Sequence, residues 1–193
     1  MEVVNSLQNE IARFTASLPD PLKLTDQNLT KFLDTADWIA FLLIHVWISH
    51  LHIDLYRFAL PGLREQAHPD LLRKLPKDFI SKSQKQAVAH ALSLGRLFQT
   101  IQTDYGRTAN EVGSFWLVPT VVQVAKVLMK AIQHQLCRDL SDHTTAPLWR
   151  SAEASDQEVR GLIDWSVRIV EPWSNQVPCM APIVSYGHGN APP

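Results

Sequence analysis

The sequence predicts an all-α protein: a single irregular helical domain of about five main helices followed by a disordered tail. Four segments place apolar residues at intervals of three and four, which is the period of an amphipathic helix. A fifth segment, residues 38–48, is apolar almost throughout except for one histidine. No pair of alternating segments suggests a sheet. We assign residues 1–170 to the helical domain and the proline-rich residues 171–193 to the tail.

The first two elements are a short amphipathic helix and a longer apolar one. In residues 2–18 the apolar positions share one face, and Pro19 ends the helix. These positions are Val4, Leu7, Ile11, Phe14 and Leu18. Residues 19–31, with two prolines, are predicted to be a loop. The second helix, about 36–59, is apolar nearly all round, so burial on several sides is expected, with Trp47 in the core.

The next three helices are predicted at about 78–104, 117–138 and 155–171. Residues 61–76 hold three prolines and are expected to connect with at most a short helical turn. The helix at 78–104 places Gly95 on its apolar face, where it would permit close helix approach. That face comprises Val88, Ala91, Leu92, Gly95, Phe98 and Ile101. At 117–138 the apolar stripe is Val121, Val124, Ala125, Leu128, Ile132 and Leu136, and the polar side is Gln123, Lys126, Lys130 and Gln133.

Residues 139–154 are predicted to be a polar linker before the last helix. Ser155 and Glu158 have the spacing of a capping box, in which each satisfies an amide at the helix start. Val159, Leu162, Ile163 and Val170 continue the helix, and Pro172 ends it.

Composition restricts the classes of function. The net charge is −1, which argues against electrostatic binding of DNA or anionic membranes by the whole chain. The apolar run at 38–48 is shorter than the roughly 20 residues that span a bilayer, so a core helix is expected. Cys137 and Cys179 are interpreted as reduced thiols of a nuclear or cytosolic protein, and residues 1–18 do not have the pattern of a secretory signal.

Several residues invite a chemical interpretation. His45, His50 and His52 could hold a metal, but a zinc-binding helix usually places histidines four apart, and that spacing is absent. Cys137 has His134 three residues before it, which would share its helical face, but no recognisable catalytic motif is present. We therefore expect no catalytic, metal-binding or cofactor-binding residue.

The only basic cluster is interpreted as a solvated helix face with its incoming loop, although it could serve nuclear import or contact phosphate. It comprises Arg73, Lys74, Lys77, Lys82 and Lys85.

The most informative segment is the end of the long apolar helix. Asp54 and Arg57 are three apart, so on a helix they lie on one side and can form an ion pair. Pro61 and Gly62 then end the helix. This segment resembles the fungal-specific transcription factor domain, the helical regulatory region that follows a zinc binuclear-cluster DNA-binding module. The matching residues are Trp47, Asp54, Leu55, Tyr56, Arg57, Leu60, Pro61 and Gly62.

The resemblance extends over residues 20–140, and one position departs from it: Ile53 stands where members often carry cysteine. In that family the segment is a structural signature, so the resemblance implies no catalytic role. It implies a nuclear protein; without it, a cytoplasmic location would be expected. The family's DNA-binding module holds zinc with six cysteines, and two scattered cysteines cannot build it. The resemblance therefore implies a truncated product or fragment, or a standalone relative that lost the module.

The resemblance implies a regulatory part that controls transcription by RNA polymerase II without contacting DNA itself. Zinc is expected only in a missing upstream module. Binding of a protein partner, self-association or binding of a small effector all remain open, whereas nucleic acid and membrane binding are not expected. Two alternatives also remain. One is a helical interaction module acting through residues 2–18, and the other is a helical enzyme using His45, His50 and His52.

Overall fold

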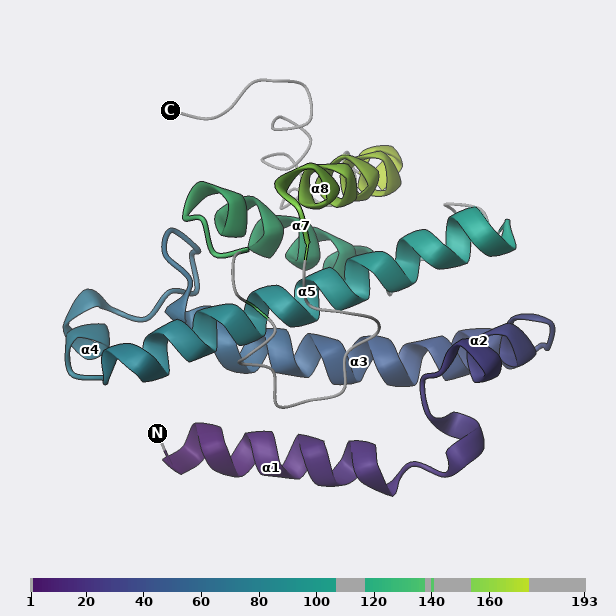
Figure 1. Cartoon of the computed structure of the whole chain (residues 1–193), viewed down its shortest axis with the longest axis horizontal. Helices are drawn as coiled ribbons and strands as arrows, with labels where there is room; N and C mark the ends of the chain where they lie inside the picture. The colour runs from purple at the N-terminus through teal and green to yellow at the C-terminus, as the bar shows by residue number, and fades with distance from the viewer. Residues whose placement is uncertain (1, 107–116, 138–139, 141–153, 174–193) are drawn as a thin grey trace.

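The computed structural model describes residues 2–106, 117–137, 140 and 154–173 (Figure 1). Throughout the described part every secondary-structure element is a helix, which confirms the predicted all-α class. Most of the expected linker at 139–154 and most of the expected tail at 171–193 lie outside the described residues, as does Cys179.

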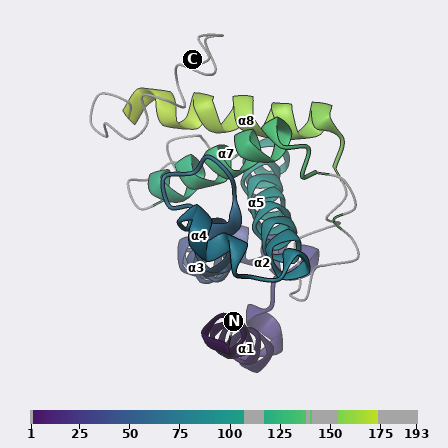
Figure 2. The same ribbon diagram turned by 90° about the vertical axis from the view of Figure 1, so that its left-hand side faces the viewer.

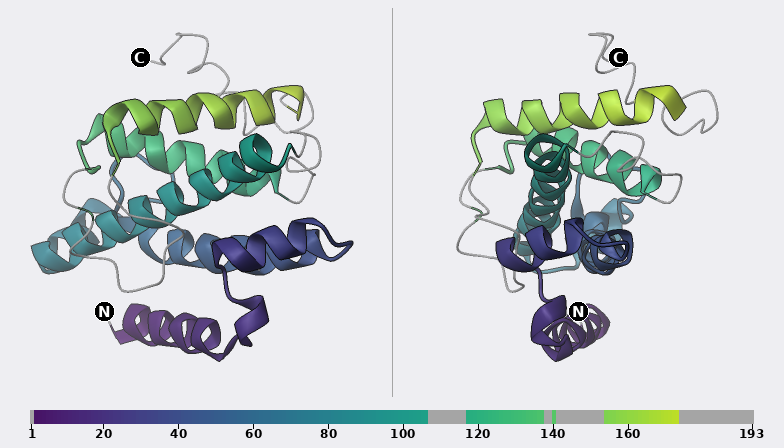
Figure 3. Two further views of the ribbon diagram at one scale, coloured as in Figure 1. Left: turned by 45° about the vertical axis from the view of Figure 1, so that its right-hand side comes forward. Right: turned by 90° about the vertical axis from the view of Figure 1, so that its right-hand side faces the viewer.

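The helices form tiers around one long central helix. α5 (Lys77–Tyr105) crosses the middle of the molecule, with α3 (Trp38–Tyr56) on one side and α7 (Val118–Gln133) and α8 (Asp156–Val170) on the other (Figure 2). α1 (Glu2–Ser17) lies outermost, beneath α3 and on the opposite side of the molecule from α8 (Figure 3). Short elements complete the chain: η1 (Asp20–Leu22), α2 (Asp26–Leu33), η2 (Arg57–Ala59), α4 (Pro69–Arg73) and η4 (Glu171–Trp173).

Residues 19–31 are not the predicted loop, because they contain η1 and most of α2. Thr25 caps α2: its hydroxyl oxygen accepts a hydrogen bond from the backbone N–H of Asn28 at 3.1 Å. Leu29 and Leu33, four residues apart, are buried beneath the helix. A capping threonine followed by an apolar pair was therefore a readable helix signal, and the two prolines obscured it.

α1 has the predicted length but packs only at its edge. It has no fully buried side chain, and its half-buried residues Val4, Gln8, Ile11 and Thr15 lie on one face of the helix, which contacts α3. Leu7 and Phe14, which the sequence places on the same apolar stripe, are exposed to solvent. The apolar stripe of α1 is thus wider than its contact with α3.

α3 is a core helix on only part of its circumference. Phe41, Leu42 and Ile53 are buried toward the interior. Trp47 is 50% exposed and Leu51 is 48% exposed. The expectation that Trp47 belongs to the core is therefore wrong, and so is the expectation of burial on several sides for the face that carries these two residues. By length and composition the stretch Trp38–Ala59 could also cross a membrane, a property that core helices share.

Gly95 permits the predicted close approach between α5 and the upper tier. A Cβ atom at this position would lie 3.5 Å from Leu162 of α8 and 3.6 Å from Val124 of α7. The predicted apolar face of α5 is fully buried, and so are Val121, Ala125 and Leu128 of α7. α7 ends at Gln133 and not at the predicted residue 138. Two residues after this end, Gln135 takes a positive φ of 55°, which is not a helical conformation.

α8 begins with the predicted serine cap, and the carboxylate of Glu158 pairs with a residue of α5. The Ser155 hydroxyl oxygen accepts a hydrogen bond from the Glu158 backbone N–H at 3.2 Å. The Glu158 carboxylate accepts one from Arg96 Nε on α5 at 2.7 Å, and Arg96 is nearly buried. This charged contact joins the two helices on which Phe98 and Trp165 stack, with ring centroids 6.1 Å apart.

Candidate functional site

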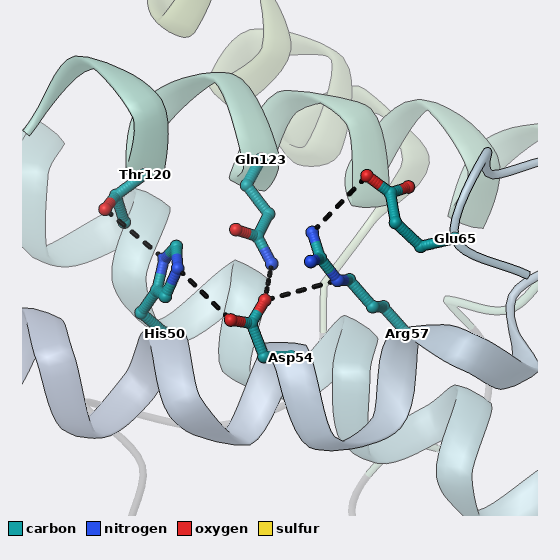
Figure 4. Close-up of polar contacts among 6 residues, drawn as sticks. All are labelled: His50, Asp54, Arg57, Glu65, Thr120 and Gln123. Atoms are coloured by element: carbon teal, nitrogen blue, oxygen red, sulfur yellow. Dashed lines mark hydrogen bonds and ion pairs between the residues drawn. The ribbon is translucent and has the colours of Figure 1, made fainter.

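The resembling segment occupies the C-terminal end of α3 and the turn that follows. Asp54 and Arg57 form the predicted ion pair, with 3.2 Å between Arg57 Nε and Asp54 Oδ1 (Figure 4). Arg57 Nη1 also lies 3.7 Å from Glu65 Oε1, beyond the turn. The guanidinium is therefore held between two carboxylates, one on its own helix and one on the following loop.

α7 completes this arrangement from the opposite side. Gln123 Nε2 donates a hydrogen bond to Asp54 Oδ1 at 2.6 Å. His50 Nε2 lies 3.4 Å from Asp54 Oδ2, and Thr120 Oγ1 lies 3.3 Å from His50 Nδ1. We call these six residues, His50, Asp54, Arg57, Glu65, Thr120 and Gln123, the α3/α7 polar network. Asp54 is its centre, because three of the other five contact that carboxylate.

The protonation of His50 follows from its surroundings. Burial lowers its pKa, the carboxylate of Asp54 raises it and the guanidinium of Arg57 lowers it again, with a net shift downward. The imidazole is thus neutral at neutral pH. A proton on Nε2 suits the geometry, since Nε2 then donates to Asp54 and Nδ1 accepts from the Thr120 hydroxyl.

The three histidines of α3 point to different places. His45 Nε2 bonds the carbonyl oxygen of Leu22 at 2.9 Å, and its pKa is lowered mainly by burial. His52 is buried and stacks on His90 of α5, with ring centroids 4.1 Å apart and planes 5° from parallel. Within the described residues no three histidine, cysteine or acidic side chains gather into a group that could hold a metal ion.

The large hydrophobic residues of the resembling segment belong to the core or pack against it, with one exception. Tyr56 and Leu60 are buried and Leu55 is half-buried against the core. Burial raises the pKa of Tyr56 to about 12, so the phenol is neutral at neutral pH. The exception is Trp47, whose ring meets His50 edge-on, with centroids 5.5 Å apart, while half of it stays in solvent.

The backbone conformation of the Pro61–Gly62 turn favours glycine. Gly62 has a φ of 73°, a conformation that side chains disfavour. A Cβ atom there would lie 2.8 Å from Lys130 Nζ of α7, a contact that the flexible end of the lysine could relieve by moving. The Gly62 N–H donates to Gln66 Oε1 at 2.9 Å, which fixes the turn that brings Glu65 toward Arg57.

A cleft opens beside the network, between this turn and α7. Its volume is about 280 Å³. It is lined by Arg57, Leu63, Arg64, Glu65, Pro119, Val122, Gln123, Lys126 and Val127. Three of these carry positive charge and one carries negative charge, above an aliphatic floor. This combination suits a small ligand with an apolar body and an anionic group.

The other sequence candidates lie elsewhere. Cys137 is buried, and burial together with the negative charge of Asp156 raises its pKa to about 11, so the thiol is not activated. His134 lies past the end of α7 and does not share a helical face with Cys137, contrary to the expectation. In the basic cluster Arg73 pairs with Asp70, and Lys74, Lys77 and Lys82 are exposed, as expected for a solvated face.

Sequence reasoning found Asp54 and Arg57 but missed the partners from other elements. Gln123 was assigned to the polar side of its helix, yet it is buried and faces Asp54. Thr120 and Glu65 gave no local signal, because their roles depend on how α7 and the turn pack against α3.

The comparisons with known proteins give no independent assignment of this site. No protein-family model matches the chain, and neither a curated protein nor a solved structure is significantly similar to it.

Proposed function

We propose that this chain is the regulatory, non-DNA-contacting part of a fungal transcription factor, which acts on RNA polymerase II transcription in the nucleus through an effector or partner. The observation that carries the proposal is the role of the resembling segment. Asp54 joins α3 to α7 through Gln123, and Arg57 joins α3 to the following turn through Glu65. A segment that organises a helical core is what the resemblance implies for a regulatory domain.

The chemistry of the network favours binding over catalysis. Its acid, Asp54, is held by Gln123 and Arg57, and its histidine is neutral and bonded on both ring nitrogens. Neither the network nor the lining of the adjoining cleft includes a serine or a cysteine. The cleft is therefore proposed as the effector site, with Arg64 and Lys126 meeting an anionic group.

A tethering experiment tests the proposal. The chain is fused to a heterologous DNA-binding domain in yeast, and transcription of a reporter carrying the cognate sites is measured. We expect the fusion to change reporter output several-fold relative to the DNA-binding domain alone. Arg64→Glu with Lys126→Glu, which reverses the charge of the cleft, should alter that output, whereas Lys82→Glu on the exposed face of α5 should not.

The proposal fails if the fusion accumulates in the nucleus and leaves the reporter at the level of the DNA-binding domain alone. A mobility-shift assay tests the proposal that the chain does not itself contact DNA. The isolated chain should give no sequence-specific mobility shift at physiological salt, and a competitor-resistant shift would contradict it.

An interaction module without any DNA-binding partner is the second candidate. The wide apolar stripe of α1, of which only part contacts α3, favours it. The enzyme alternative has less support, because His45, His50 and His52 diverge to separate partners.

A further inference from the structure

The exposed apolar side chains are concentrated on two neighbouring helices. In the described part of the chain seven large hydrophobic residues are exposed, and six of them lie on α1 or α3. They are Val3 (71%), Leu7 (48%), Phe14 (55%), Ile39 (46%), Trp47 (50%) and Leu51 (48%); the seventh is Leu71 (57%) on α4. Single exposed apolar residues are ordinary, but such a concentration is not.

The helical period places five of these residues on one side of the α1/α3 pair. On α1, Val3, Leu7 and Phe14 are four and seven residues apart, so they form one stripe. On α3, Trp47 and Leu51 are four apart and form another.

The cavity between α1 and α3 shows on which side of their contact the two exposed stripes lie. This cavity, of about 340 Å³, is lined by Ala12 and Ala16 of α1, His45 and Ser49 of α3, and Ser93 of α5, so it lies on the α5 side of the line of contact. α1 and α3 run antiparallel (Figure 1). On each helix the exposed stripe lies across the contact line from these cavity residues, and the two stripes therefore meet in one surface. We call Val3, Leu7, Phe14, Trp47 and Leu51 the α1/α3 surface.

We propose that a second copy of this chain covers the α1/α3 surface, forming a symmetric dimer. The exposed parts of these five side chains, with half-buried Ile44 between the stripes, amount to an apolar area on the order of 500 Å². A standard interface buries about 800 Å² per partner, and about 65% of a homodimer interface is apolar. The apolar area available is therefore what one such interface needs.

The charges fit a second copy better than a membrane. A helix that lies on a lipid surface carries many lysines and arginines on its polar face. α1 has only Arg13 as a base, beside Glu2 and Glu10, and Arg13 is paired with Glu10. Two copies, each of net charge −1, repel only weakly. A twofold axis would bring the same five residues of each copy face to face.

Sedimentation equilibrium of the full chain from about 1 to 100 μM tests the inference. The variants substitute exposed residues, so they should not disturb the fold of the monomer. We expect a concentration-dependent dimer for the native chain. Trp47→Glu and Leu7→Glu, one on each helix, should each weaken association at least tenfold. Leu71→Glu, an equally exposed apolar residue on α4, is the matched control and should leave it unchanged.

Circular dichroism at low concentration confirms that each variant keeps the native helix content. A native chain that stays monomeric to 100 μM overturns the proposal, and so does a dimer that neither charged variant weakens. A monomer that binds vesicles containing anionic lipid would assign the surface to a membrane instead. A monomer that dimerises only with an added amphipathic peptide would assign it to a heterologous partner.

Discussion

At the scale of single residues, exposure separates two aromatic side chains that the sequence makes look equivalent. Trp47 and Phe98 both lie among apolar residues of long helices, yet Phe98 is completely buried and Trp47 is half exposed. The free energy of unfolding depends on the area that each ring removes from water and on the cavity that its truncation leaves.

We therefore expect Phe98→Ala to lower the free energy of unfolding by about 3–5 kcal/mol and Trp47→Ala by about 1 kcal/mol or less. Urea denaturation followed by circular dichroism measures both, at several protein concentrations so that any contribution from association is visible. Equal losses at low concentration would show that α3 is buried all round after all.

A second residue-scale feature is the stacked pair of buried imidazoles. His52 Nδ1 and His90 Nε2 are buried without a hydrogen-bond partner within the described residues. Burial lowers the pKa of His52 to about 4, and burial and the neighbouring His52 lower the pKa of His90 well below 6.5. Both rings are therefore neutral in the folded protein at neutral pH, whereas in the unfolded chain they take up protons near pH 6.5.

This difference in proton binding makes the free energy of unfolding depend on pH. Above pH 6.5 neither state binds these protons, and stability is unaffected. As pH falls from 6.5 toward 4 the unfolded state binds more protons, so the folded state loses stability, by about 3 kcal/mol for His52 alone. We expect urea midpoints to fall over this range, and to fall less in His52→Phe. The exposed His134→Gln should keep the native slope, and an unchanged slope in His52→Phe would contradict the assignment.

At the scale of elements, the contacts between helices explain what sequence patterns could and could not predict. The apolar stripes of α5, α7 and α8 were readable because each helix buries one face at a 3.6-residue period. α2 was missed because two prolines suggested a loop, although Thr25 and the pair Leu29 and Leu33 carry a helix signal. Gln123 was misplaced because local polarity does not reveal an acid brought alongside by another helix.

A double-mutant cycle can measure the strength of the hydrogen bond between Gln123 of α7 and Asp54 of α3. Gln123 donates to the charged Asp54, whose side chain is 37% exposed, so solvent reduces the strength of its interactions. We expect Asp54→Asn and Gln123→Ala each to cost about 1–2 kcal/mol, with a coupling of about 1 kcal/mol. Asp20→Asn, in an exposed pair with Lys23, is the control and should leave the free energy of unfolding unchanged. Additive single effects would show that the bond contributes little.

Gly95 gives a test of the α5 contact with the upper tier. An alanine Cβ would meet Leu162 and Val124 at ordinary van der Waals distance, and alanine favours a helix over glycine by up to about 1 kcal/mol. Gly95→Ala should therefore raise the thermal midpoint slightly. Gly95→Leu should lower the free energy of unfolding by about 1–3 kcal/mol through overpacking, and with it the thermal midpoint. A large loss in Gly95→Ala would mean that the helices lie closer than described.

At the scale of the whole molecule, stability is unevenly distributed. α5 shares contacts with α3, α7 and α8, and residues 87–98 are all buried. α1 contacts mainly α3 and buries no side chain completely. The predicted fold class and main helices could be read from period and composition, but this ranking could not, because it depends on which faces other helices cover.

Native-state hydrogen exchange should reveal that ranking. We expect amides in α1 to exchange through local opening, faster than those of α5 at residues 87–98 by a factor on the order of 100 or more. The α5 amides should exchange only through global unfolding. Uniform protection across α1 and α5 would show that α1 unfolds together with the core.

The central place of α5 also bears on the fate of incomplete chains in the cell. The side of α5 that holds Gly95 and Phe98 is covered by α7 and α8, which come later in the sequence. A ribosome that stalls, or a message that ends early, would release a product with that apolar side uncovered. Chaperones and proteases act on such surfaces, so half-made copies would be removed rather than persist as competing binders.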